Sequence, residues 1–123
     1  MRMFFLAVAA TLVSGCTYDT PAPKTPDTSG QSYAEALGAM CDVDKLAAIA
    51  PDEDPLSLGR KRTEWIQQNV VNADGIYLRT WLSVRGPGDQ ASALRDEAKK
   101  EAGLATCALA DDLEKNGLGG LSP

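Results

Sequence analysis

The sequence predicts an all-α domain, a small bundle of four to five short helices stapled by one disulfide. Three observations lead to this prediction. Apolar residues recur every three or four positions through most of the chain, as they do along the buried face of a helix. Ser, Asp and Asn residues, which cap helix starts, stand ahead of several of these stretches. Two of the three cysteines lie far apart in the same region, where a disulfide would close a long loop.

The first predicted helix begins at Ser32. Ser32 and Glu35 have the spacing of a capping box, in which each side chain accepts a hydrogen bond from the backbone of the other. The apolar positions that follow share one helical face: Leu37, Met40, Cys41, Leu46 and Ile49. Asp42 or Asp44 is able to restart the helix partway along this stripe.

The second predicted helix begins at Asp54-Pro55, an N-cap residue followed by a proline in the first helical position. Its apolar residues lie mostly on one face: Leu58, Trp65, Ile66 and Val70. The basic run Arg60-Lys61-Arg62 is expected on the solvated face, because successive helical residues are about 100° apart and three neighbours form no single patch.

The segment from Gly75 to Val84 fits two structures. Its apolar residues alternate as in a strand, and Tyr77 and Trp81 favour β structure. The same residues fit a helix capped by Asn72. The helix is preferred because a strand needs a partner and the sequence offers no second convincing β run.

Two further helices complete the predicted bundle. Pro87 and Asp89 open the first, whose narrow apolar stripe ends before Gly103, a residue suited to a helix C-terminus. The stripe consists of Ala91, Leu94, Ala98 and Ala102. Thr106 is expected to cap the last helix, which ends at Asn116-Gly117.

The amino terminus has the pattern of a secretory signal peptide. Arg2 gives a basic start, and Phe4 to Val13 form an apolar run that is too short to cross a bilayer as a helix. Residues 1–15 are therefore predicted to be a signal peptide.

The residues Val13-Ser14-Gly15-Cys16 resemble the lipobox of bacterial lipoproteins. In that family the signal is cut before the cysteine, and its sulfur carries a diacylglycerol. The resemblance implies that Cys16 anchors the chain in a lipid bilayer. Thr17 stands where an Asp favours retention in the inner membrane, so the resemblance favours the outer membrane of the cell envelope.

The mature chain is predicted to have three parts. Residues 16–31, the lipidated cysteine and a Pro-rich segment, cannot bury enough apolar surface to fold and would act as a tether. Fully extended, the fifteen residues after Cys16 reach about 45 Å. Residues 32–117 would form the helical domain, and the Gly-rich residues 118–123 a flexible tail.

Cys41 and Cys107 are the cysteines that remain once Cys16 is assigned to lipid, and an even pair in an exported protein predicts a disulfide. Such a link would remove about 4 kcal/mol of unfolded-chain entropy. The alternative, a redox pair, lacks the Cys-x-x-Cys spacing that lowers a thiolate pKa.

The composition excludes several kinds of chemistry. The chain has no histidine, which removes histidine bases and ligands, and three cysteines are too few for a four-thiolate zinc site. The net charge of −5 argues against nucleic-acid binding. The acids Asp52-Glu53-Asp54 lack the spacing of a calcium loop. No metal and no cofactor is therefore expected.

These observations predict a non-enzymatic interaction or structural module with an envelope protein as its partner. Tyr77, Leu78, Trp81 and Leu82 are the candidate partner surface, because they surround a helix and cannot all face one core. The alternative is an accessory cell-wall glycan hydrolase with paired carboxylates such as Asp52 or Glu64.

The region from Cys41 to Leu113 also loosely resembles uncharacterised two-cysteine helical domains of exported bacterial lipoproteins. The resemblance lies in three places: Cys41-x-Val43-Asp44-x-Leu46, the Trp65-Ile66 helix and Leu104-x-x-Cys107-x-Leu109. It implies a fold and an export route but no activity.

Overall fold

The computed structural model describes residues 27–116 and 120–122, and these residues form helices without any strand. The all-α prediction is confirmed, and the ambiguous segment from Gly75 to Val84 is helical. The helices are α1 (Tyr33–Cys41), α2 (Val43–Leu46), α3 (Pro55–Asn69), α4 (Ala73–Ser83), α5 (Pro87–Ala102) and α6 (Ala108–Asn116). The described residues thus contain one helix more than expected, because Asp42 separates the single-turn α2 from α1.

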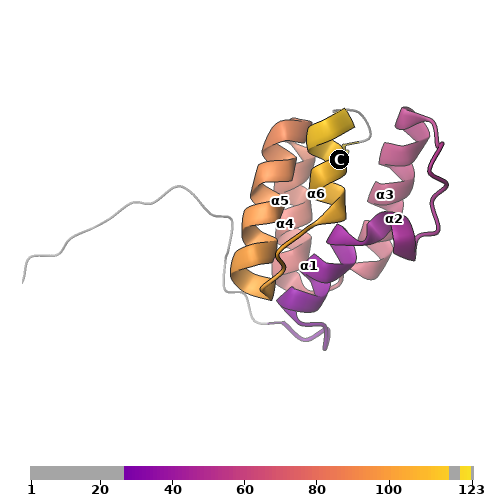
Figure 1. Ribbon diagram of the computed structural model, residues 1–123. Coiled ribbons are helices and arrows are strands. Elements are labelled where there is room, and N and C mark those ends of the chain that lie inside the picture. Colours follow the sequence, from indigo (N-terminus) through magenta and orange to yellow (C-terminus); the bar gives the residue numbers. More distant parts are fainter. Residues whose placement is uncertain (1–26, 117–119, 123) are drawn as a thin grey trace, which may run out of the picture.

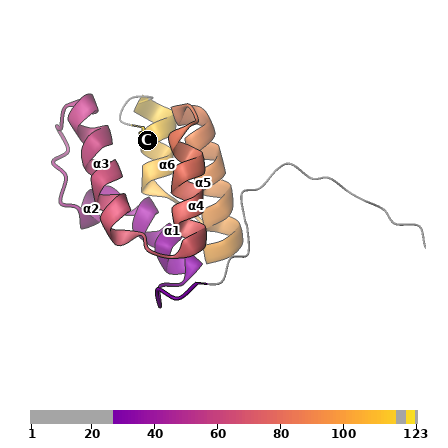
Figure 2. The ribbon, with the colours of Figure 1, turned by 180° about the vertical axis from the view of Figure 1, so that it is seen from behind.

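Helix α1 is the centre of the bundle. Helices α4, α5 and α6 lie side by side, α1 crosses near one end of this group, and α3 stands on the other side with α2 beside it (Figures 1 and 2). Each of the other five helices packs against α1. The position of α3 therefore depends on α1 and α2, whereas α4 and α6 are also held by α5.

The core is built mainly from small and aliphatic side chains. Ala36, Leu37 and Met40 of α1 are fully buried. The other helices contribute the remaining core residues, chiefly Ile66, Leu78, Leu82, Ala91, Leu94, Ala98, Leu109, Ala110 and Leu113. Gly75 lets α4 approach α1 closely, since a Cβ atom there would lie 2.9 Å from the Cβ atom of Ala36.

Most of the predicted helix ends are confirmed. Glu35 N–H donates to the Ser32 hydroxyl at 3.0 Å, and Ser32 N–H donates to the Glu35 carboxylate at 2.7 Å. Asp54 accepts from the backbone at the start of α3, and Asn72 does so at the start of α4. Gly103 ends α5 with a φ of 65°, in the left-handed region that favours glycine.

The prediction for the start of α6 was wrong by one residue. The helix begins at Ala108, so Cys107 and not Thr106 directly precedes it. The carbonyl of Cys107 accepts the first helical hydrogen bond, from Asp111 N–H at 3.0 Å. Cys107 thus takes part both in the disulfide and in the first hydrogen bond of α6.

The end of the predicted tether belongs to the folded domain. The side-chain oxygen of Gln31 accepts from Val71 N–H at 2.9 Å and from Asn72 N–H at 3.0 Å, in the connection between α3 and α4. Asp27 accepts from the Asn72 side chain at 3.1 Å. The hydrogen bond from the Ser29 side chain lowers the pKa of Asp27, which keeps the carboxylate ionised as an acceptor. The folded part therefore includes Asp27 and Gln31 and does not begin at Ser32.

The predicted disulfide is confirmed. Cys41 at the end of α1 and Cys107 before α6 are both buried, and their sulfur atoms are bonded, with the two Cα atoms 4.8 Å apart. The link spans 66 positions of the sequence. It joins the first helix of the bundle to the last.

Replacing both Cys41 and Cys107 by alanine should lower the free energy of unfolding by about 4 kcal/mol, because the unfolded chain regains the entropy of the opened loop. For a domain of this size the thermal midpoint should fall by roughly 20 °C. Thermal unfolding followed by circular dichroism measures the shift, and reduction of the wild-type protein should reproduce it. Equal midpoints for the oxidised wild type and the double variant would contradict a stabilising role.

Candidate functional site

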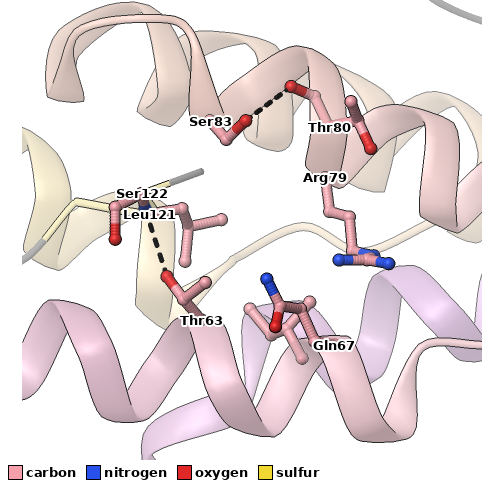
Figure 3. Close-up of a pocket in the computed structure, with 8 residues that line it drawn as sticks. Thr63, Gln67, Arg79, Thr80, Ser83, Leu121 and Ser122 are labelled. Carbon is pink, nitrogen blue, oxygen red and sulfur yellow. Dashed lines mark hydrogen bonds between the residues drawn. The ribbon is translucent and has the colours of Figure 1, made fainter.

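The main candidate site is a cleft between α3 and α4. The first of these helices packs on α1 and α2 and the second on α1 and α5, so their facing sides are left apart. The space between them has a volume of about 210 Å³. Figure 3 shows the two helices facing each other across this space, with the carboxyl-terminal segment at one end.

Eight residues from three segments line the cleft. They are Thr63, Ile66 and Gln67 from α3, Arg79, Thr80 and Ser83 from α4, and Leu121 and Ser122 from the carboxyl-terminal segment. Ile66 and Leu121 give it an apolar part, while the other six side chains carry four hydroxyls, an amide and a guanidinium. Arg79 is the one charged residue among these eight.

The guanidinium of Arg79 lies in the cleft. Figure 3 shows it reaching from α4 toward Gln67 on α3. Its Nε atom is buried and has no hydrogen-bond partner among the described residues. A buried donor without an acceptor costs roughly 1–3 kcal/mol, and more when the group is charged. A ligand oxygen that accepted from this guanidinium would offset that cost.

Three of the four hydroxyl groups that line the cleft are already hydrogen-bonded to the backbone. Thr80 donates to the carbonyl of Ile76 at 2.9 Å, and Ser83 donates to the carbonyl of Thr80 at 2.7 Å. The Thr63 hydroxyl accepts from Ser122 N–H at 3.1 Å. Arg79 and Gln67 are therefore the lining side chains whose N–H groups are best placed to donate to a ligand.

The carboxyl-terminal segment closes one end of the cleft. Leu121 was predicted to lie in a flexible tail, but it is buried, and Gln90 of α5 binds both its backbone N–H and its carbonyl. The Gln90 side chain accepts from Leu121 N–H at 3.1 Å and donates to the Leu121 carbonyl at 3.0 Å. The prediction of a flexible tail was therefore wrong for Leu121 and Ser122, because Gln90 and Thr63 satisfy their backbone groups.

An ion network around the buried Arg62 holds α3, one wall of the cleft. Arg62 was predicted to be solvated, but its side chain is only 1% exposed. Its guanidinium donates to the carboxylates of Asp44 at 2.7 and 2.5 Å and of Asp112 at 2.7 Å. Burial alone would lower the pKa of Arg62, but these hydrogen bonds raise it. The guanidinium therefore stays charged and joins α3 to α2 and α6.

The sequence contained the pattern that places Arg62 inside. Arg62 stands four and eight positions before Ile66 and Val70, which are both buried, so the three residues share one helical face. Arg60 and Lys61 are exposed, as expected. Arg79 had no comparable indication, because its role depends on a cleft formed by distant segments.

The structure divides the predicted partner surface on α4. Leu78 and Leu82 are fully buried in the core, so their inclusion was wrong. Both α1 and α5 pack against α4, so more of the surface of α4 is buried than the sequence indicated. Tyr77 is 46% exposed, and Trp81 is partly buried with the Arg85 guanidinium 4.3 Å from its ring centre.

An exposed apolar strip on α4 adjoins the cleft. Ile76, Thr80 and Val84 are spaced four residues apart and therefore lie along one line of the helix. Thr80 lines the cleft, and Val84 is 72% exposed. Tyr77 follows Ile76 on the side of the strip away from the cleft-lining Arg79 and Ser83, about 100° around the helix. We call Ile76, Tyr77, Thr80 and Val84 the α4 strip.

The carboxylates proposed for glycan hydrolysis lie on different segments of the described chain. Asp52 lies exposed in the loop before α3, and Glu64 lies exposed on α3. Glu64 lines a shallow depression with Lys61, Trp65 and Gln68, and Asp52 is not part of it.

One carboxylate is buried, on α5. Glu97 accepts a hydrogen bond from the Tyr33 hydroxyl at 2.7 Å, and its other oxygen has no hydrogen-bond partner among the described residues. Burial raises the pKa of Tyr33, and the bond to Glu97 raises it further, so the phenol stays protonated as the donor. The pair lies between α1 and α5, outside the cleft.

Other predicted features fall outside what the structure describes. Cys16, the predicted lipidation site, precedes the described residues. Within residues 27–116 and 120–122, no group of three or more metal-ligating side chains has a suitable arrangement, and no helix has the length and apolar character needed to span a membrane.

Comparisons with known proteins give no relative. No protein-family model, no curated protein and no solved structure matches the chain.

Replacing both Asp44 and Asp112 by asparagine should cost about 3 kcal/mol of folding free energy, because the buried Arg62 charge loses the two carboxylates that compensate it. Chemical denaturation measures this loss. Glu53→Gln is the matched control: its partner Lys61 is nearly half exposed, and such surface pairs contribute less than about 1 kcal/mol. Equal losses in the control and in the double variant would contradict the role given to Arg62.

Proposed function

We propose that this protein is a lipid-anchored module of the bacterial cell envelope that works by binding a neighbouring envelope protein, without catalysis. The observation that carries the proposal is the α3–α4 cleft with the α4 strip beside it. A concave site that contains one guanidinium and an apolar wall, next to exposed apolar side chains, has the composition of a recognition surface.

The chemistry of the cleft favours binding over bond breaking. Its lining residues include no carboxylate, thiol or lysine, and three of its four hydroxyls donate to or accept from the backbone. A nucleophilic hydroxyl needs a neighbouring base to activate it. The cleft offers none among its lining side chains, whereas an arginine and an amide suit the recognition of an acidic or carbonyl group.

The α4 strip suits contact with a polypeptide. Tyr77 and Val84 are large and exposed, and aromatic residues at such positions contribute strongly to protein contacts. A partner segment that lay along the strip would place its neighbouring residues over the cleft. The partner we propose is therefore an envelope protein that presents apolar residues together with an anionic group.

The proposed anchor sets the reach of this surface. Ten residues stand in the sequence between Cys16 and Asp27, the first described residue. An extended segment of that length spans about 31 Å. This would keep the domain close to the membrane that holds the lipid, and outer-membrane placement remains the proposal drawn from Thr17.

Replacing Cys16 by serine should release the protein from membranes, since acyl chains on this residue would be its anchor. Membrane fractions washed in high salt measure the effect: the wild type should stay in the pellet, and the variant should either appear in the soluble fraction or keep its uncleaved leader. A variant that is processed normally and still remains in the washed membranes would refute lipid anchoring at Cys16.

Replacing Val84 by aspartate should reduce capture of the partner from envelope extract at least tenfold, because a charge would enter the apolar contact. Quantitative mass spectrometry of proteins bound to the immobilised chain gives the measurement. Leu46→Asp is the matched control, since Leu46 is also exposed and apolar but lies on α2, outside the cleft and strip.

Circular dichroism should show that both variants keep the helical fold, as expected for changes at exposed positions. If no protein depends on Val84, or if Leu46→Asp removes the same proteins, the surface proposed here is wrong.

A further inference from the structure

We infer that the α3–α4 cleft binds a monocarboxylate that carries a compact apolar group. The inference rests on the proposed function, since it names the chemical class of ligand for the same site. Its test uses purified protein and defined probes, so it can fail while membrane anchoring and partner capture succeed, and the reverse.

The charge of the cleft points to an anion. Arg79 is the one charged side chain among the lining residues, and its buried Nε has no acceptor among the described residues. Arg79 also forms no ion pair with a described residue. A bound anion would supply both the missing acceptor and the missing countercharge.

The geometry of the donors favours a carboxylate. A guanidinium presents parallel N–H groups that match the two oxygens of a carboxylate. Gln67 faces Arg79 across the cleft and offers an amide donor to the same region (Figure 3). A single guanidinium balances a single negative charge, which favours a monocarboxylate over a phosphate dianion.

The remaining space favours a small apolar group. Ile66 and Leu121 are buried and supply the apolar lining. The volume of about 210 Å³ exceeds the roughly 150 Å³ of an engineered apolar cavity that binds benzene. A carboxylate with one aromatic ring or one branched aliphatic group therefore fits, whereas a large ligand does not.

Two sources can supply this chemistry: a free carboxylic acid, or the last residue of a polypeptide chain with its terminal carboxylate. Calorimetric titration of the full chain in neutral detergent micelles separates them. The probes are benzoate, its neutral counterpart benzamide, and a tetrapeptide ending in phenylalanine with either a free or an amidated carboxyl terminus.

We expect benzoate to bind with a Kd on the order of 1 mM, as suits a ligand of its size. Benzamide should bind at least tenfold more weakly, because it lacks the charge. Tighter binding of the free-carboxyl peptide than of benzoate would identify a chain terminus as the ligand, whereas preference for benzoate would identify a free acid. Both results support the inference.

The variants locate the binding. Arg79→Gln should weaken benzoate binding at least tenfold. Arg85→Gln removes the same charge from a residue on the Trp81 ring outside the cleft, and should change the Kd less than twofold. Equal binding of benzoate and benzamide, absence of binding to either acid, or unchanged binding by Arg79→Gln would overturn the inference.

A second measurement decides the case in which Arg79→Gln does not fold. In the wild-type chain, benzoate should shift the amide resonances of cleft residues such as Thr63, Gln67 and Ser83 in two-dimensional NMR spectra. Shifts confined to residues outside the cleft would overturn the inference.

Discussion

The disulfide between Cys41 and Cys107 fixes the end of α1 beside the start of α6, and the other helices are positioned around that contact. The core that surrounds it consists mostly of alanine and aliphatic side chains, and neither tryptophan is fully buried. A core of this kind in a short chain supplies a limited free energy, so a covalent link forms a large part of the stability. Because α1 contacts the five other helices, a link at its end constrains the whole bundle.

The cleft exists because α3 and α4 are held mainly by other helices and not by each other. Arg62 joins α3 to α2 and α6 through Asp44 and Asp112, while α4 packs closely on α1 through Gly75. Two extended segments then fix the ends of the space. Gln31 binds the backbone of the connection between α3 and α4, and Leu121, held by Gln90, lies between the helices at the other end. The positions of the cleft walls thus depend mainly on residues outside the cleft. Most of its lining side chains are therefore not needed to hold α3 and α4 in place.

Local patterns in the sequence were enough to predict the helices and the disulfide. The hydrogen bonds of Ser32 and Asn72 are made within a few residues along the chain, and cysteine pairing follows from number and context. The parts that were missed depend on distant segments. Gln31 bonds to residues about forty positions away, and Gln90 bonds to Leu121. No local sequence pattern around either glutamine indicates these bonds.

The buried positions of Leu78 and Leu82 were missed because the number of helices that cover α4 is a tertiary property. The solvated position expected for Arg62 was wrong, although its four-residue spacing to Ile66 indicates the buried face of α3.

A comparison of Arg62 and Arg79, on the two facing helices, supports the binding of an external anion in the cleft. Arg62 on α3 is buried and is compensated by two carboxylates, whereas the Nε of Arg79 on α4 is buried without an acceptor among the described residues. The chain has more acidic than basic residues, with 17 Asp and Glu against 12 Lys and Arg. None of these carboxylates lines the cleft beside Arg79. A buried N–H group without an acceptor costs stability, so an arginine that served stability alone would be better placed with its Nε in water or beside an acid. Its position in a cleft with room for a small molecule is explained if the anion that compensates it comes from a ligand.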